Sequence, residues 1–160
     1  MSFAHSKLAI MLTGMGDIAG AEENYDAALT GGQRLPADDP GSNEDRQTVS
    51  GAYLGKSRLA ELTGDFATAA EYSDKYATME PSGQSIYSVE RLYLAAARSV
   101  RTPASGKANF WQAARDAAQR CLEFLQAQAT KVPLGPNDAG IQRLASRDLA
   151  QCDAALAVVQ

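Results

Sequence analysis

Residues 64–72 read GDFATAAEY, a stretch that ends one helix and starts the next. Glycine just after a helix adopts the left-handed conformation that ends it, and aspartate just before a helix accepts hydrogen bonds from free N–H groups. Gly64 and Asp65 therefore predict two helices with almost no loop between them, which makes them antiparallel neighbours. Ala69 and Ala70 leave room for the partner helix to approach closely. The stretch predicts a tight helical hairpin.

A weaker copy of this signal, GDIAGAEEN, begins at Gly16. The two turns predict hairpins over about residues 4–38 and 43–80, and Pro81 closes the second of them. Apolar and small residues at helical spacing predict the helices themselves, which we place from the N-terminus to about residue 14, from 18 to about 35, from 43 to 63 and from 66 to 79.

A third hairpin is predicted over about residues 84–131. FWQAARDA from Phe110 matches FATAAEYS from Phe66, with alanines three and four residues after the phenylalanine. Here the stretch RTPASGKAN takes the place of the Gly–Asp turn, so we expect a longer loop and a second helix that begins near Phe110. A last helix, over about 137–160, has no partner of its own and is expected to cap the stack.

Composition favours an all-α chain with one domain over residues 1–160, because alanine and leucine outnumber valine and isoleucine. The formal net charge is −4, which gives no general attraction to nucleic acid. Residues 1–80 hold 6 Lys and Arg against 13 Asp and Glu, and residues 81–160 hold 9 against 6. This asymmetry indicates two solvated faces, or ends that attract each other between molecules or prefer different partners.

The N-terminal residues lack the charged segment, apolar core and cleavage site of a signal peptide. No run approaches the ~18 apolar residues of a membrane span, so we predict no membrane association and a cytoplasmic protein. The two cysteines, Cys121 and Cys152, lie in apolar helical patterns and are expected to be buried free thiols.

The hairpins resemble the tetratricopeptide repeat, a family with small residues where its two helices cross, a Gly–Asp turn and a closing proline. Long repeats of this kind, attached to bacterial signalling proteins, are similar over about residues 8–81. The resemblance implies an α-α superhelix (a solenoid). The residues that carry it are Ala9 and Ser57 at the small position of the first helices, Ala21 and Ala69 at that of the second helices, Tyr25 at the aromatic position and Pro81 at the closing position.

The resemblance further implies a non-catalytic module that binds a peptide or partner protein in a groove lined by the first helix of each hairpin. The groove residues implied are Leu54, Arg58, Glu61, Leu62, Val89, Leu92 and Ala96. Relatives that grip a C-terminal carboxylate use Lys and Asn where this chain has Ser6, Ile10 and Leu54, so that activity is not expected. The alternative is a self-associating structural domain, a homo-oligomer, because the first helix is short and has a bare side.

We predict no catalytic residue, no metal and no cofactor. His5 is the only histidine and lies near the N-terminus, and neither cysteine has a histidine nearby in sequence. Three arginines, Arg91, Arg98 and Arg101, fall roughly along one side of a predicted helix, as a solvated face or as a patch for an acidic partner. Trp111 is expected to pack against the adjoining turn, or else to anchor a partner.

Overall fold

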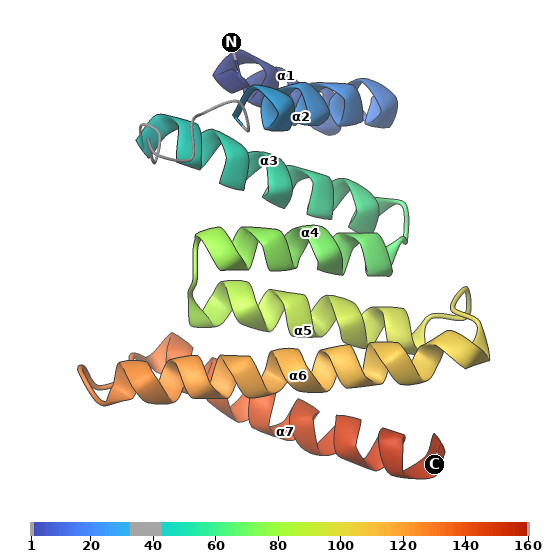
Figure 1. Ribbon diagram of the computed structural model, residues 1–160, viewed down its shortest axis with the longest axis vertical. Coiled ribbons are helices and arrows are strands. Elements are labelled where there is room, and N and C mark those ends of the chain that lie inside the picture. Colours follow the sequence, from blue (N-terminus) through green and yellow to red (C-terminus); the bar gives the residue numbers. More distant parts are fainter. Residues whose placement is uncertain (1, 33–42, 160) are drawn as a thin grey trace. The chain divides into compact units, whose positions relative to one another are not determined.

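The computed structural model describes residues 2–32 and 43–159, and in these ranges it contains seven helices and no strand (Figure 1). The all-α prediction is therefore confirmed at the level of fold class. The helices are α1 (Ser2–Met15), α2 (Ile18–Gly32), α3 (Asn43–Leu62), α4 (Phe66–Met79), α5 (Gly83–Arg98), α6 (Ala104–Ala129) and α7 (Pro136–Val159). The predicted extension of the second helix to residue 35 lies outside the described residues.

The chain divides into two compact units, Met1–Glu80 (unit 1) and Pro81–Gln160 (unit 2). The boundary falls at Pro81, the residue predicted to close the second hairpin. The expectation of one domain over the whole chain stays a prediction.

The two short turns of unit 1 have the conformation that their residues predict. Gly16 and Gly64 have φ angles of 80° and 76°, in the left-handed region that glycine tolerates. Asp17 accepts a hydrogen bond from the Gly20 N–H at 3.0 Å, and Asp65 accepts one from the Thr68 N–H at 3.1 Å. Each turn therefore ends one helix and caps the next, and α1–α2 and α3–α4 form the predicted hairpins.

Small residues set the spacing between the helices of unit 1. Ala9, Ala21 and Ala69 are fully buried, and the Ser57 hydroxyl donates a hydrogen bond of 2.8 Å to the carbonyl of Ala69, from α3 to α4. Beyond its hairpin partner, α3 also packs against α1 and α2. The core here is Ala9, Ala21, Tyr25, Ala28, Leu29, Ala52 and Leu59.

Unit 2 consists of the α5–α6 hairpin and α7, which packs on both of these helices. The capping box of α5 joins Ser82 and Ser85, each side chain accepting from the backbone N–H of the other. Fully buried side chains in this unit include Leu125 and Cys121 on α6 and Cys152 on α7.

The predicted start of α6 near Phe110 is wrong, because α6 begins at Ala104. Pro103 occupies the N-cap position, where its missing N–H costs no helical hydrogen bond. The residues that follow are small or good helix formers, and the single Gly106 lowers helix stability by only about 1 kcal/mol. The loop between α5 and α6 is accordingly shorter than the stretch RTPASGKAN suggested.

Candidate functional site

The four predicted groove residues of α3 share one face of that helix. Leu54, Arg58 and Leu62 follow one another at intervals of four residues, with Glu61 beside them, so their side chains point to the same side. Leu54 is half-buried, Arg58 and Glu61 are exposed, and the Leu62 side chain is 67% exposed. This face is accessible to a partner.

The same face of α3 continues toward its N-terminus as one wall of a depression shared with α1. The depression has a volume of about 240 Å³. Gln47 and Gly51 of α3 lie four residues apart, in line with Leu54, and contribute to the wall. The full lining is Phe3, Ser6, Lys7, Ile10, Gln47, Thr48 and Gly51. We call this surface, together with Leu54, Arg58, Glu61 and Leu62, the α1–α3 face.

Exposed apolar groups and one cation characterise the α1 wall of this face. Phe3 and Ile10 are 50% and 54% exposed, and both line the depression. The Lys7 ammonium group lies 5.1 Å from the centre of the Phe3 ring, within the range of a cation–π interaction. Among the described residues that line the depression there is no carboxylate, although unit 1 as a whole is acidic.

The three predicted groove residues of α5 are not accessible. Val89, Leu92 and Ala96 have exposed fractions of 0%, 9% and 2%. They belong to unit 2, whereas the α3 residues belong to unit 1. Their burial follows from a strongly amphipathic helix whose apolar side is turned inward.

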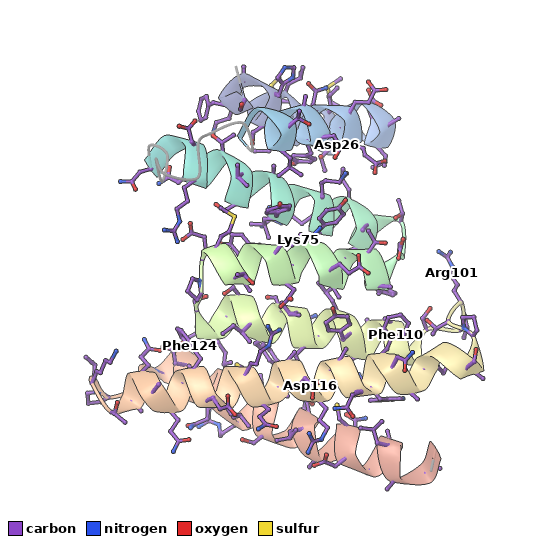
Figure 2. All side chains as sticks on the ribbon, in the orientation of Figure 1. Asp26, Lys75, Arg101, Phe110, Asp116 and Phe124 are labelled. Carbon is purple, nitrogen blue, oxygen red and sulfur yellow. The ribbon has the colours of Figure 1, made fainter. Side chains whose placement is uncertain are left out.

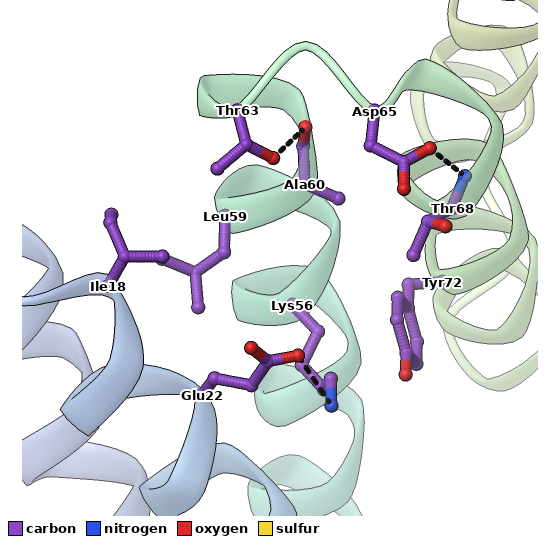
Figure 3. A pocket seen from close by; sticks show the side chains of 9 residues that line it. All are labelled: Ile18, Glu22, Lys56, Leu59, Ala60, Thr63, Asp65, Thr68 and Tyr72. Carbon is purple, nitrogen blue, oxygen red and sulfur yellow. Dashed lines mark hydrogen bonds and ion pairs between the residues drawn. The ribbon is translucent and has the colours of Figure 1, made fainter.

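A second depression of unit 1, of about 220 Å³, lies between α2, α3 and α4 (Figure 3). The Lys56 side chain is only 7% exposed there, and its ammonium group pairs with Asp26 and lies 3.8 Å from Glu22. It also lies 5.0 Å from the centre of the Tyr72 ring. Burial alone would lower the pKa of Lys56. Hydrogen bonds to Asp26 and Tyr72 and the negative charge of Asp26 act in the opposite direction and outweigh burial, so the pKa of Lys56 is raised above its ordinary value of 10.5.

Lys56 is therefore a charged side chain on α3 whose partners lie within the protein, on α2 and on α4. It connects these three helices. Figure 2 marks Asp26 on α2 and Lys75 on α4, the second lysine of this region, which lies 5.0 Å from the centre of the Tyr72 ring. Sequence reasoning did not single out Lys56. The available signal was the pair Glu22 and Asp26, which stand four residues apart and so face the same side of α2.

The candidate nucleophiles have environments that oppose reactivity. Burial, with smaller contributions from nearby carboxyl groups, raises the pKa of Cys121 to about 12 and that of Cys152 to about 11. Both thiols are free, as predicted, and protonated at neutral pH. His5 is half-buried, and its Nδ1 lies 2.9 Å from the Asn24 amide oxygen.

Neither a metal-binding cluster nor a membrane-spanning helix occurs among the described residues. Within residues 2–32 and 43–159, no three side chains of His, Cys, Asp or Glu are placed to share a metal ion. Across the same part of the chain, every helix falls short of the length and apolar character that crossing a bilayer requires.

The predicted arginine row of unit 2 is interrupted. α5 ends at Arg98, and Arg101 lies in the loop before α6, as Figure 2 shows. Arg98 lies 5.8 Å from the centre of the Trp111 ring and donates a hydrogen bond of 2.7 Å to Gln151. Trp111 itself is half-buried against the cluster of Leu94, Ala114 and Cys152, in the packed position rather than the exposed one.

Comparison with known proteins yields no match to a protein-family model, to a curated protein or to a solved structure. The resemblance to the tetratricopeptide repeat therefore stays a prediction.

Proposed function

We propose that this chain is a protein-interaction module, built as a stack of helical hairpins of the tetratricopeptide type, that binds a peptide segment of a partner on the α1–α3 face. The observation that carries the proposal is the depression between α1 and α3, with its half-exposed Phe3 and Ile10. Large apolar side chains at the wall of a depression lose unfavourable contact with water when a partner covers them.

The charges of the face define the kind of partner. Lys7 and Arg58 are basic and Glu61 is acidic, so basic groups outnumber acidic ones among the described residues of the face, while the unit has 13 acidic residues against 6 basic ones over residues 1–80. A segment with carboxylates beside apolar side chains would pair with this face and be repelled by the surrounding surface. The partner we propose is therefore an amphipathic, acidic peptide segment.

The proposed role is non-catalytic. The two thiols are buried and protonated, the Lys56 ammonium group is charged and paired, and the imidazole of His5 is placed against an amide. These states leave the described residues without an activated nucleophile or a general base next to one, which supports a binding role.

Capture of partners from a lysate of the source organism tests the proposal when wild type is compared with the variant Ile10→Asp, Arg58→Glu. Both positions are exposed, so the variant is expected to keep its helical content by circular dichroism. We expect it to lose the specific partner, and to bind a synthetic peptide of that partner's acidic segment at least about tenfold more weakly. Loss of an apolar contact and reversal of one charge cost about 1.4 kcal/mol or more together.

The control is the variant Met11→Asp, Met15→Asp, which changes the other exposed side of α1. Equal capture of the same partners by all three proteins, or a partner that binds through a basic segment, would exclude the α1–α3 face as the site described here.

Self-association is a second candidate, favoured by a separate apolar stripe on α1. Leu8, Met11 and Met15 recur at helical spacing and are 45%, 64% and 78% exposed. Leu8 and Met15 of this stripe point away from the depression, because each lies more than a quarter turn around the helix from Phe3 and Ile10. Two copies could pack these stripes against each other across a two-fold axis.

Light scattering over a range of concentrations tests the second candidate. We expect a concentration-dependent dimer for wild type and for Ile10→Asp, Arg58→Glu, and a monomer for Met11→Asp, Met15→Asp. A wild-type monomer at the highest concentration would remove this candidate and leave the first one untouched.

A further inference from the structure

Two carboxyl groups are buried at the interface between α5 and α7. Glu90 on α5 is 0% exposed and Asp148 on α7 is 3% exposed. Neither oxygen of the Glu90 carboxylate accepts a hydrogen bond from any described residue. An ionised carboxylate in such a place loses its water without compensation, so the neutral acid is strongly favoured.

Ionisable groups on α5, α6 and α7 face Glu90. They are Tyr87 on α5, Cys121 on α6, and Arg147, Asp148 and Cys152 on α7. The guanidinium group of Arg147 forms an ion pair with Asp148 at 2.8 Å. Burial, the negative charge of Asp148 and the hydrogen bond to it raise the pKa of Glu90 to about 8, although Arg147 acts in the opposite direction.

We propose that Glu90 and Asp148 share one proton across this interface, and that its loss loosens the docking of α7 on the α5–α6 hairpin. With the proton present, Glu90 donates a hydrogen bond to the Asp148 carboxylate. When the proton is lost, the two negatively charged carboxylates face each other in a buried site, where no described residue donates a hydrogen bond to Glu90. α7 also supplies Cys152 to the cluster with Leu94 and Ala114, so a loosened α7 uncovers apolar surface of the hairpin. The interface thus works as a pH-sensitive cap.

The direction of the pH effect follows from proton linkage. The pKa of Glu90 is about 8 in the folded protein against 4.5 when unfolded, so the folded state holds one more proton between these values. The stability that this proton contributes is complete below pH 4.5 and is lost as the pH rises to 8. The equilibrium constant for opening α7 therefore rises by up to about tenfold per pH unit within this window.

Hydrogen exchange of the α7 amides in wild type and in Glu90→Gln tests the proposal. The α7 sequence is the same in both proteins, so the ratio of their exchange rates at one pH cancels the intrinsic pH dependence. We expect the ratio of wild-type to variant rates to rise about fiftyfold from pH 6 to pH 8. A ratio that stays constant with pH would overturn the proposal. The matched control is Glu123→Gln on α6, an exposed position, where a constant ratio is expected.

A measurement on the wild type alone keeps the test decisive if Glu90→Gln fails to fold. The carboxyl carbon of Glu90 can be followed by NMR as the pH changes. A midpoint near 8 supports the shared proton, and a midpoint near the ordinary value of 4.5 contradicts it.

Discussion

Replacement of Leu125 by alanine is expected to destabilise unit 2 by about 3–4 kcal/mol. Leu125 is fully buried on α6 and packs against Gly83 at the start of α5, where a methyl group added to the glycine would lie 2.7 Å from the leucine Cδ2. Glycine has no side chain that can move into the space left by the truncated leucine. The cavity therefore stays, and its cost adds to the lost apolar burial.

Urea denaturation followed by Trp111 fluorescence measures this effect, because the only tryptophan packs against the core cluster of the same unit. Leu144→Ala on α7 is the matched control, since that side chain is 37% exposed and its truncation is expected to cost less than about 1 kcal/mol. Similar losses for the two variants would show that Leu125 is not a packing centre of unit 2.

Gly55→Ala has the second largest expected effect, a destabilisation of unit 1 by about 1–3 kcal/mol. Alanine is the better helix former by about 1 kcal/mol, so propensity alone predicts the opposite sign. The added methyl group would lie 2.1 Å from the Tyr25 ring, however, and that ring is only 2% exposed. Either α2 or the ring must move, and both are enclosed by the core.

Gly51→Ala is the control for this prediction, one turn earlier on the same helix. No atom lies within 4 Å of the position of its added methyl group, so we expect a gain of about 1 kcal/mol. Thermal unfolding by circular dichroism, with hydrogen exchange of α2 and α3, compares the two variants. A gain in both would mean that the contact between Tyr25 and Gly55 does not set the distance between these helices.

The hairpin turns could be predicted from the sequence because their chemistry is local. A positive φ angle at Gly64 and a capping carboxylate at Asp65 are properties of two adjacent residues, and the structure confirms both. The start of α6 could not be predicted in the same way. Its first turn depends on how residues 99–103 leave α5, and matching Phe110 to Phe66 carried no information about those residues.

The candidate site was predicted in part. The resemblance supplied the face of α3, but the opposite wall with Phe3 and Lys7 depends on which helix lies beside α3. Glu90 was missed for another reason. A single charged residue in an apolar helical pattern can lie at the exposed edge of the helix or be buried beside another polar side chain. Only the position of Asp148 on α7 distinguishes these two cases for Glu90.

The pattern of helix contacts has a consequence for how each unit reaches its native state. Within a unit, the main contacts of every described helix are with the next helix in the chain or the next but one. Few long loops must close before these contacts form, which means a low contact order. Chains of this kind cross their folding barrier within microseconds to milliseconds, so the hairpins of a unit can form while the chain is still being synthesised.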